Sequence, residues 1–187
     1  MDVQLACDYI ITKMEGAGTT LSVLKLLKLL YFSQQWHLTF YGDLLFEGRF
    51  QAWDQGPVSR EIYDRFVGCR SLYSEVSAAD VSRDFAVASL ACEKRSHLDH
   101  VLDAYAKCKD SALDEMIRYD EPWLEARRGF AERCENEINE DHMRRFCMLL
   151  YLLKQFGTGG VTCAQRQTFQ VPAGPRESER VFDEILV

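Results

Sequence analysis

The chain has 187 residues, a formal net charge of −7 and a hydrophobic fraction of 47%. This length suits one compact domain, and this apolar content excludes a wholly disordered protein. Nucleic-acid binding is not expected, because neutralising phosphates needs a surplus of Lys and Arg and the chain contains no long basic run.

The longest apolar stretch, residues 21–41, is interrupted by Lys25, Lys28 and His37. It is therefore expected to be a buried helix and not a membrane span. The first residues contain no basic segment followed by an apolar one, so no secretory signal is expected. Seven scattered cysteines without a Cys-x-x-Cys pair are typical of free, mostly buried thiols in the reducing cytoplasm.

The spacing of apolar residues predicts two helices near the start of the chain. The first covers residues 2–14, with Asp2 as its N-cap. The second is capped by Thr19 or Thr20 and extends to about Phe40.

Large apolar side chains occupy nearly all faces of this second helix, so it is expected to lie at the centre of the domain. Its polar side chains Lys25, Lys28, Gln35 and Thr39 fall on one narrow stripe of the helix surface. We expect this stripe to reach solvent or a partner protein.

A short turn-and-strand unit follows the central helix. Gly48 and Arg49 separate two short apolar runs, which predicts a β-hairpin over residues 45–54. Gly56 and Pro57 are then expected to start a third helix, because proline favours the first helical position. The apolar face of that helix comprises Val58, Ile62 and Phe66, and Gly68 ends it.

Residues 69–95 are irregular in composition, and a short helix after Asp80 is the one element expected there. Four more helices are predicted in the second half of the chain. Two of them are predicted to start at capping boxes, at Ser96 and Ser111. The third starts at Pro122, and the fourth is capped by Asn139 and ends at Gly157.

Residues 158–187 lose the aliphatic periodicity and become rich in Gly, Thr, Gln and Pro. We therefore expect a helical domain over residues 1–157, followed by a linker and tail in which residues 178–186 could form a short helix. The predicted fold class is mainly α: a compact multi-helix domain around a buried central helix, with one short β-hairpin.

Two segments of the chain together resemble the Panacea family of SocA-like antitoxin domains, which includes phage-associated proteins. These are a Lys-Leu-Leu-Tyr-Phe segment and an Ala-Trp-x-x-Gly-Pro-Val segment, and neither alone would be specific. The resemblance covers about residues 5–150. Its matching stretches are 24–32, 36–38, 42–46, 50–63, 98–105, 120–127 and 138–141.

The resemblance implies an antitoxin that neutralises a toxin encoded beside it by direct binding. In one branch of the family the domain acts instead as an adaptor that delivers the toxin to the ClpXP protease. An alternative is a phage or mobile-element protein of the same fold that binds a host defence or protease component. The family usually carries Thr-His before its Pro-Trp pair, whereas this chain has Arg118 and Tyr119.

Partner contacts are expected along the polar stripe and at the hairpin, because aromatic side chains beside a rigid turn are plausible interface anchors. A purely structural role is the favoured alternative for Trp53, which would fill the core, and for Gly56-Pro57, which would fix the turn. The candidate partner-binding residues are Lys25, Lys28, Gln35, Trp53, Asp54 and Gln55.

No catalytic, cofactor or metal site is predicted. His97 and His100 lie between Cys92 and Cys108, but zinc sites have tighter cysteine spacing, so two solvated histidines are the preferred interpretation. His37 is expected to be partly buried and hydrogen-bonded. A hydrolase that uses one cysteine is the weakest hypothesis, since a cysteine nucleophile needs a nearby histidine.

Overall fold

The computed structural model describes residues 1–67, 70–127, 134–156 and 170–174. Within them the chain is mainly α-helical, which confirms the predicted fold class. The α-helices are α1 (Val3–Gly16), α2 (Val23–Tyr41), α3 (Arg60–Val67), α4 (Cys92–Tyr105), α5 (Asp110–Arg118), α6 (Glu121–Arg127) and α7 (Glu140–Phe156). The strands are β1 (Leu21–Ser22), β2 (Phe50–Trp53), β3 (Gly56–Ser59) and β4 (Glu75–Val76).

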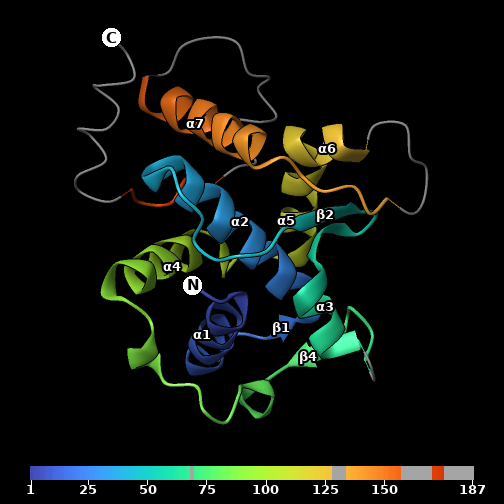
Figure 1. The fold of residues 1–187 in the computed structure, drawn as a ribbon, viewed down its shortest axis with the longest axis vertical. Coiled ribbons are helices and arrows are strands. Elements are labelled where there is room, and N and C mark those ends of the chain that lie inside the picture. Colours follow the sequence, from blue (N-terminus) through green and yellow to red (C-terminus); the bar gives the residue numbers. More distant parts are fainter. Residues whose placement is uncertain (68–69, 128–133, 157–169, 175–187) are drawn as a thin grey trace.

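Helix α2 is the centre of the molecule. Figure 1 shows α7 across one side of it, α4 and α1 on others, and the strands β2 and β3 with α5 along the remaining side. Every residue of α2 from Val23 to Phe40 is buried. A helix that is apolar on nearly all faces is stable only where other elements cover it, and each large buried side chain contributes roughly 1.5–3 kcal/mol before entropy.

Helix α2 begins later than predicted. Thr19 and Thr20 do not cap it, because Leu21 and Ser22 first form an extended strand in which Leu21 pairs with Val76 of β4. Ser22 then caps the helix through its hydroxyl oxygen. The N-cap therefore depends on a strand partner that lies more than fifty residues away in the sequence.

The β-hairpin is present, but it lies farther along the chain than residues 45–54. β2 pairs with β3 in antiparallel register, and the turn between them is Asp54-Gln55. Gly56 and Pro57 consequently belong to β3 and do not start a helix; α3 begins at Arg60.

Residues 45–47 form no strand, and the side chain of Gln34 bonds the backbone of Leu45 and Phe46. Its Oε1 accepts from the amides of Leu45 (3.1 Å) and Phe46 (3.3 Å), and its Nε2 donates to the Phe46 carbonyl at 3.0 Å. Gln34 is itself buried in α2. The central helix thus supplies hydrogen-bond partners for the buried backbone of Leu45 and Phe46, as buried backbone requires.

The later helices match the predicted number, but two of their predicted starts are wrong. α4 and α5 each begin before the proposed capping serine, so Ser96 and Ser111 lie inside helices. Asn139 does cap α7, since its Oδ1 accepts from the His142 amide at 2.9 Å. Asp2 likewise caps α1. Residues 70–91 are irregular apart from β4 and two 3₁₀ helices, Ala78–Asp80 and Val87–Ser89.

Of residues 158–187, the structure describes 170–174, and this segment packs on the helices. Pro172 is buried and Val171 contacts the core. The Tyr105 hydroxyl donates to the Gln170 carbonyl, and Lys154 Nζ donates to the Val171 carbonyl at 3.2 Å. The helix predicted over 178–186 and the helix stop at Gly157 lie outside the described residues.

Candidate partner-binding surface

The tip of the β2–β3 hairpin projects Asp54 and Gln55, both exposed, from a buried base. Trp53 and Gly56 form the last pair of the ladder. Gly56 has φ +127°, a backbone conformation that L side chains rarely adopt. Glycine at this position therefore lets the two-residue turn close.

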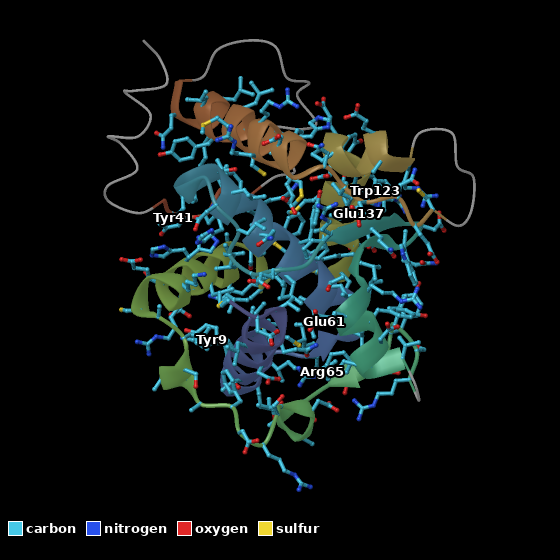
Figure 2. All side chains as sticks on the ribbon, in the orientation of Figure 1. Tyr9, Tyr41, Glu61, Arg65, Trp123 and Glu137 are labelled. Carbon is cyan, nitrogen blue, oxygen red and sulfur yellow. The ribbon has the colours of Figure 1, made fainter. Side chains whose placement is uncertain are left out.

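Both edges of the hairpin are covered within the described residues. On the β2 side, the Ala52 amide donates to the Asn136 carbonyl at 2.9 Å and the Ile138 amide donates to Phe50 at 2.8 Å. On the other side, all residues of β3 are buried and pack against α2 and α5. Figure 2 shows Trp123 and Glu137 beside β2, where these contacts meet. A partner can therefore reach the tip and its flanks but cannot add a strand to the sheet.

On one flank of the tip, Trp53 forms an aromatic cluster with α3. Its ring centroid lies 4.7 Å from that of Tyr63, and the Arg60 guanidinium lies 5.9 Å and 5.7 Å from the two rings. Trp53 and Tyr63 are each half-buried. Trp, Tyr and Arg are the residue types that most often supply binding energy at protein interfaces.

On the other flank, a groove of about 400 Å³ lies between the tip, α5 and the segment before β4. We call it the tip groove. Tyr73 is 72% exposed at its rim, which is the largest exposure among the large apolar side chains of the described residues. The residues that line it are Leu24, Asp54, Gln55, Gly56, Tyr73, Asp114, Ile117, Arg118 and Trp123.

Trp123 closes the inner end of this groove. Its side chain is 8% exposed, and its Nε1 donates to the Trp53 carbonyl at 3.1 Å. Arg127 lies over the Trp123 ring, donates to the Ala52 carbonyl at 3.0 Å and pairs with Asp54 at 3.2 Å. α6 therefore fixes the hairpin from above.

The model of the family described as "Antitoxin SocA-like, Panacea domain" matches residues 26–124, just over half of the 187-residue chain. The chain belongs to this family. No curated protein and no solved structure gives a match.

The matched region runs from α2 through the hairpin to α6, and it contains all the residues that line the tip groove of this Panacea domain except Leu24. Arg118 and Tyr119, which stand where the resemblance predicted Thr-His, are both exposed at the end of α5. One of them, Arg118, lines the groove.

The structure separates the six predicted contact residues into two groups. Trp53, Asp54 and Gln55 lie together at the hairpin tip. The stripe on α2 does not reach solvent, contrary to the prediction: Lys25, Lys28 and Gln35 are 6%, 1% and 0% exposed, and Thr39 is 4% exposed.

The stripe is buried because the second half of the Panacea domain supplies it with acidic partners. Lys25 Nζ lies 3.8 Å from Asp110 and donates to the Cys108 carbonyl at 2.9 Å. Lys28 pairs with Asp114. The two lysines are three residues apart on α2 and the two aspartates four apart on α5, so each pair lies on one face of its helix.

Gln35 extends the same pattern to Asp120, a fully buried carboxyl group at the start of α6. Gln35 Nε2 donates to Asp120 Oδ2 at 2.7 Å and to the Tyr31 hydroxyl at 3.0 Å. Burial raises the pKa of the Asp120 carboxyl to about 6, although its hydrogen-bond donors oppose this shift. This cluster could not be predicted from the sequence, because no local pattern marks Asp120 as buried.

The histidines form a structural pair. His97 is 3% exposed, so the prediction of two solvated histidines is wrong for it. Its Nε2 donates to the Ser33 carbonyl at 2.8 Å, and its ring lies 4.9 Å from that of His37. His37 is buried, with its Nδ1 2.9 Å from the Asp43 carbonyl. Among the described residues no group of three His, Cys, Asp or Glu side chains could hold a metal ion.

Burial makes three of the thiols poor nucleophiles. It raises the pKa of Cys7 to about 12, the pKa of Cys147 well above its ordinary value and, to a smaller extent, the pKa of Cys108. Cys134 is also buried and Cys92 is exposed, while Cys69 and Cys163 lie outside the described residues. In the described part of the chain, no helix combines the length and apolarity needed to cross a membrane.

Proposed function

We propose that this Panacea-domain protein neutralises a toxin protein encoded beside it by binding the toxin directly at the hairpin tip. The family assignment supports an antitoxin-like role. We choose the hairpin tip as the binding surface because its exposed turn, Asp54-Gln55, lies between an aromatic–arginine cluster and the tip groove with Tyr73 at its rim.

This surface has the composition of a binding site on a rigid support. Interface hot spots are enriched in Trp, Tyr and Arg. This surface carries four residues of these types: Trp53, Tyr63, Arg60 and Tyr73. The hairpin beneath them is held by backbone hydrogen bonds on the β2 side and by buried packing on the β3 side. Such a surface loses little conformational freedom on binding, which favours affinity.

The test is co-expression with the product of the adjacent reading frame, followed by co-purification and a growth assay. We expect the wild-type protein to bind the neighbour and to restore growth. The variant Tyr73→Ala should weaken binding about tenfold without loss of folding, because Tyr73 is mostly exposed.

The matched control is Val87→Ala, since Val87 is also an exposed apolar residue, 40% accessible, but belongs to the second 3₁₀ helix. It should bind like the wild type. If deleting this gene never unmasks toxicity of the neighbour, the antitoxin proposal fails. Recovery of a host defence or protease component from host lysate, with no binding to the neighbour, would favour the phage or mobile-element alternative.

An adaptor role is a finer form of the same proposal. It predicts that the toxin is degraded faster when this protein and a ClpXP-type protease are both present in the cytoplasm. If the toxin half-life does not change when the protease is removed, the adaptor role is excluded. The proposal of neutralisation by binding would still stand. A reducing compartment suits the five described cysteines, all of which are free thiols.

A further inference from the structure

We infer that the tip groove binds an acidic side chain of the partner, an Asp or Glu carboxylate, through Arg118. This inference rests on the proposed function, because it names the chemistry of the partner at the same surface. The basis is the pairing of the charged residues in the groove: some already have an ion-pair partner within the protein, and one has none among the described residues.

Two of the three charged residues lining the groove are neutralised within the protein. Asp54 pairs with Arg127 at 3.2 Å. Asp114 pairs with Lys28, whose side chain is almost completely buried beneath the groove. Each acid is therefore balanced by a cation on a neighbouring element, and neither leaves a net charge for a partner to meet.

Arg118 is the third charged residue of the groove. It is exposed on the last turn of α5, and no ion pair joins it to another described residue. The groove thus has a surplus positive charge on a protein whose formal net charge is −7. Charge complementarity then favours an anionic group of the partner at this position.

The surroundings of Arg118 favour a carboxylate on a protein chain. A guanidinium presents a planar set of donors that matches a carboxylate at two points. Leu24, Ile117 and Tyr73 add apolar walls, which strengthen an ion pair by excluding water. One cation in a groove of about 400 Å³ suits a single side chain better than the repeated phosphates of a nucleic acid.

The experiment measures the affinity of the full-length protein for the purified product of the adjacent reading frame. The variants are Arg118→Glu, Arg118→Gln and Arg118→Lys. The matched control is Arg83→Glu, because Arg83 is also exposed, lies between the two 3₁₀ helices and is not one of the residues that line the tip groove.

We expect Arg118→Glu to weaken binding more than about tenfold and Arg118→Gln less strongly. Arg118→Lys keeps the charge but loses the two-point match, so its affinity should lie between those of the wild type and Arg118→Gln. Arg83→Glu should bind like the wild type. The difference between the wild type and Arg118→Gln should shrink as salt is raised, because an exposed ion pair is screened. Partner variants selected to restore binding to Arg118→Glu should replace an acidic residue with Lys or Arg.

Two failures are distinguishable. If the wild type binds the neighbour and both Arg118→Glu and Arg118→Gln bind equally well, the carboxylate inference is overturned while the proposed function stands. If the wild type does not bind the neighbour, the proposed function fails and this inference falls with it. Thermal unfolding of each variant checks folding, and Arg118→Gln replaces Arg118→Glu in the comparison if the latter does not fold.

Discussion

Tyr31 and Asp120 join the central helix to the start of α6 through a hydrogen bond of 2.8 Å between two fully buried side chains. The same carboxylate accepts from Gln35 Nε2 at 2.7 Å and from the Trp123 amide at 2.9 Å. Trp123 in turn donates to the hairpin at the Trp53 carbonyl. Asp120 thus holds in place the helix that closes one end of the tip groove.

Replacing Asp120 with Ala should lower the free energy of unfolding by about 3 kcal/mol. The reason is that three buried donors lose their acceptor at once, and an unsatisfied buried donor costs about 1–3 kcal/mol. Urea denaturation at neutral pH measures this. The control is Asp103→Ala on the exposed face of α4, which should change stability by less than about 0.5 kcal/mol. Equal, small effects of the two substitutions would contradict a structural role of Asp120.

His97 should make the protein less stable as the pH falls below about 6.5. Burial lowers the pKa of His97 to about 3 in the folded state, whereas an unfolded histidine binds its proton near pH 6.5. The unfolded chain therefore takes up the proton first, and His97 should contribute a loss of about 2 kcal/mol between about pH 7.5 and about pH 5.

The carboxyl of Asp120 has the opposite effect, because its pKa is raised to about 6 and the folded state binds the proton first as the pH falls. The two contributions overlap, so the measurement is the difference between wild type and His97→Gln across this pH range. Gln can still donate to the Ser33 carbonyl without titrating. Identical pH profiles for the two proteins would show that His97 is not buried in its neutral form.

Lys28 should prove structural and not a direct partner contact. Lys28→Met keeps the buried volume of the side chain and removes a buried cation. The Asp114 carboxylate, whose side chain is 42% exposed, can then be hydrated without its partner, so stability should stay within about 1 kcal/mol of wild type. Lys28→Ala leaves a cavity and should cost about 2–4 kcal/mol. Chemical denaturation measures both. A protein with both Lys28→Met and Asp114→Asn, which removes the two charges together, would restore the predicted contact role if it folds normally but loses its partner.

Gly56→Ala should destabilise the hairpin by about 1–3 kcal/mol. An added Cβ would meet Lys28 Cε at 3.6 Å and Ile117 Cγ2 at 3.8 Å, which are ordinary contacts, so the cost comes from the φ of +127°. Gly16→Ala is the matched control, because Gly16 is a helical residue of α1 and nothing lies within 4 Å of its added Cβ. It should be neutral or slightly stabilising. Equal thermal unfolding temperatures for the two variants would refute the strain argument.

Helix positions were predictable from the sequence wherever a local pattern specified them. The apolar faces of α1, α2 and α7 and the caps Asp2 and Asn139 depend on spacings of three or four residues, and these predictions are confirmed. The caps of α2, α4 and α5 were wrong. For α2 the reason is visible: β4 holds Leu21 and Ser22 in a strand, so a long-range pairing overrides the local threonine signal.

The order of strands and turns was predicted less well for the same reason. Gly48-Arg49 and Asp54-Gln55 are both acceptable turns when judged locally. The choice between them depends on Gln34, which binds residues 45 and 46, and on the packing of β3 between α2 and α5. Neither contact has a local signature in the sequence.

The sequence alone determines that this protein is a mainly helical domain built on one apolar helix, because hydrophobic periodicity is a local property of the chain and predicts which helix must be buried. The same residues also carry the resemblance to the Panacea family. Which polar side chains are exposed was decided by the tertiary structure alone. Lys25, Lys28 and Gln35 look exposed on an isolated helix, but Asp110, Asp114 and Asp120 come from distant parts of the chain to bury and pair them. Asp54 and Gln55 remain exposed because the fold places them at the turn of the hairpin, and Trp53 beside them is half-buried.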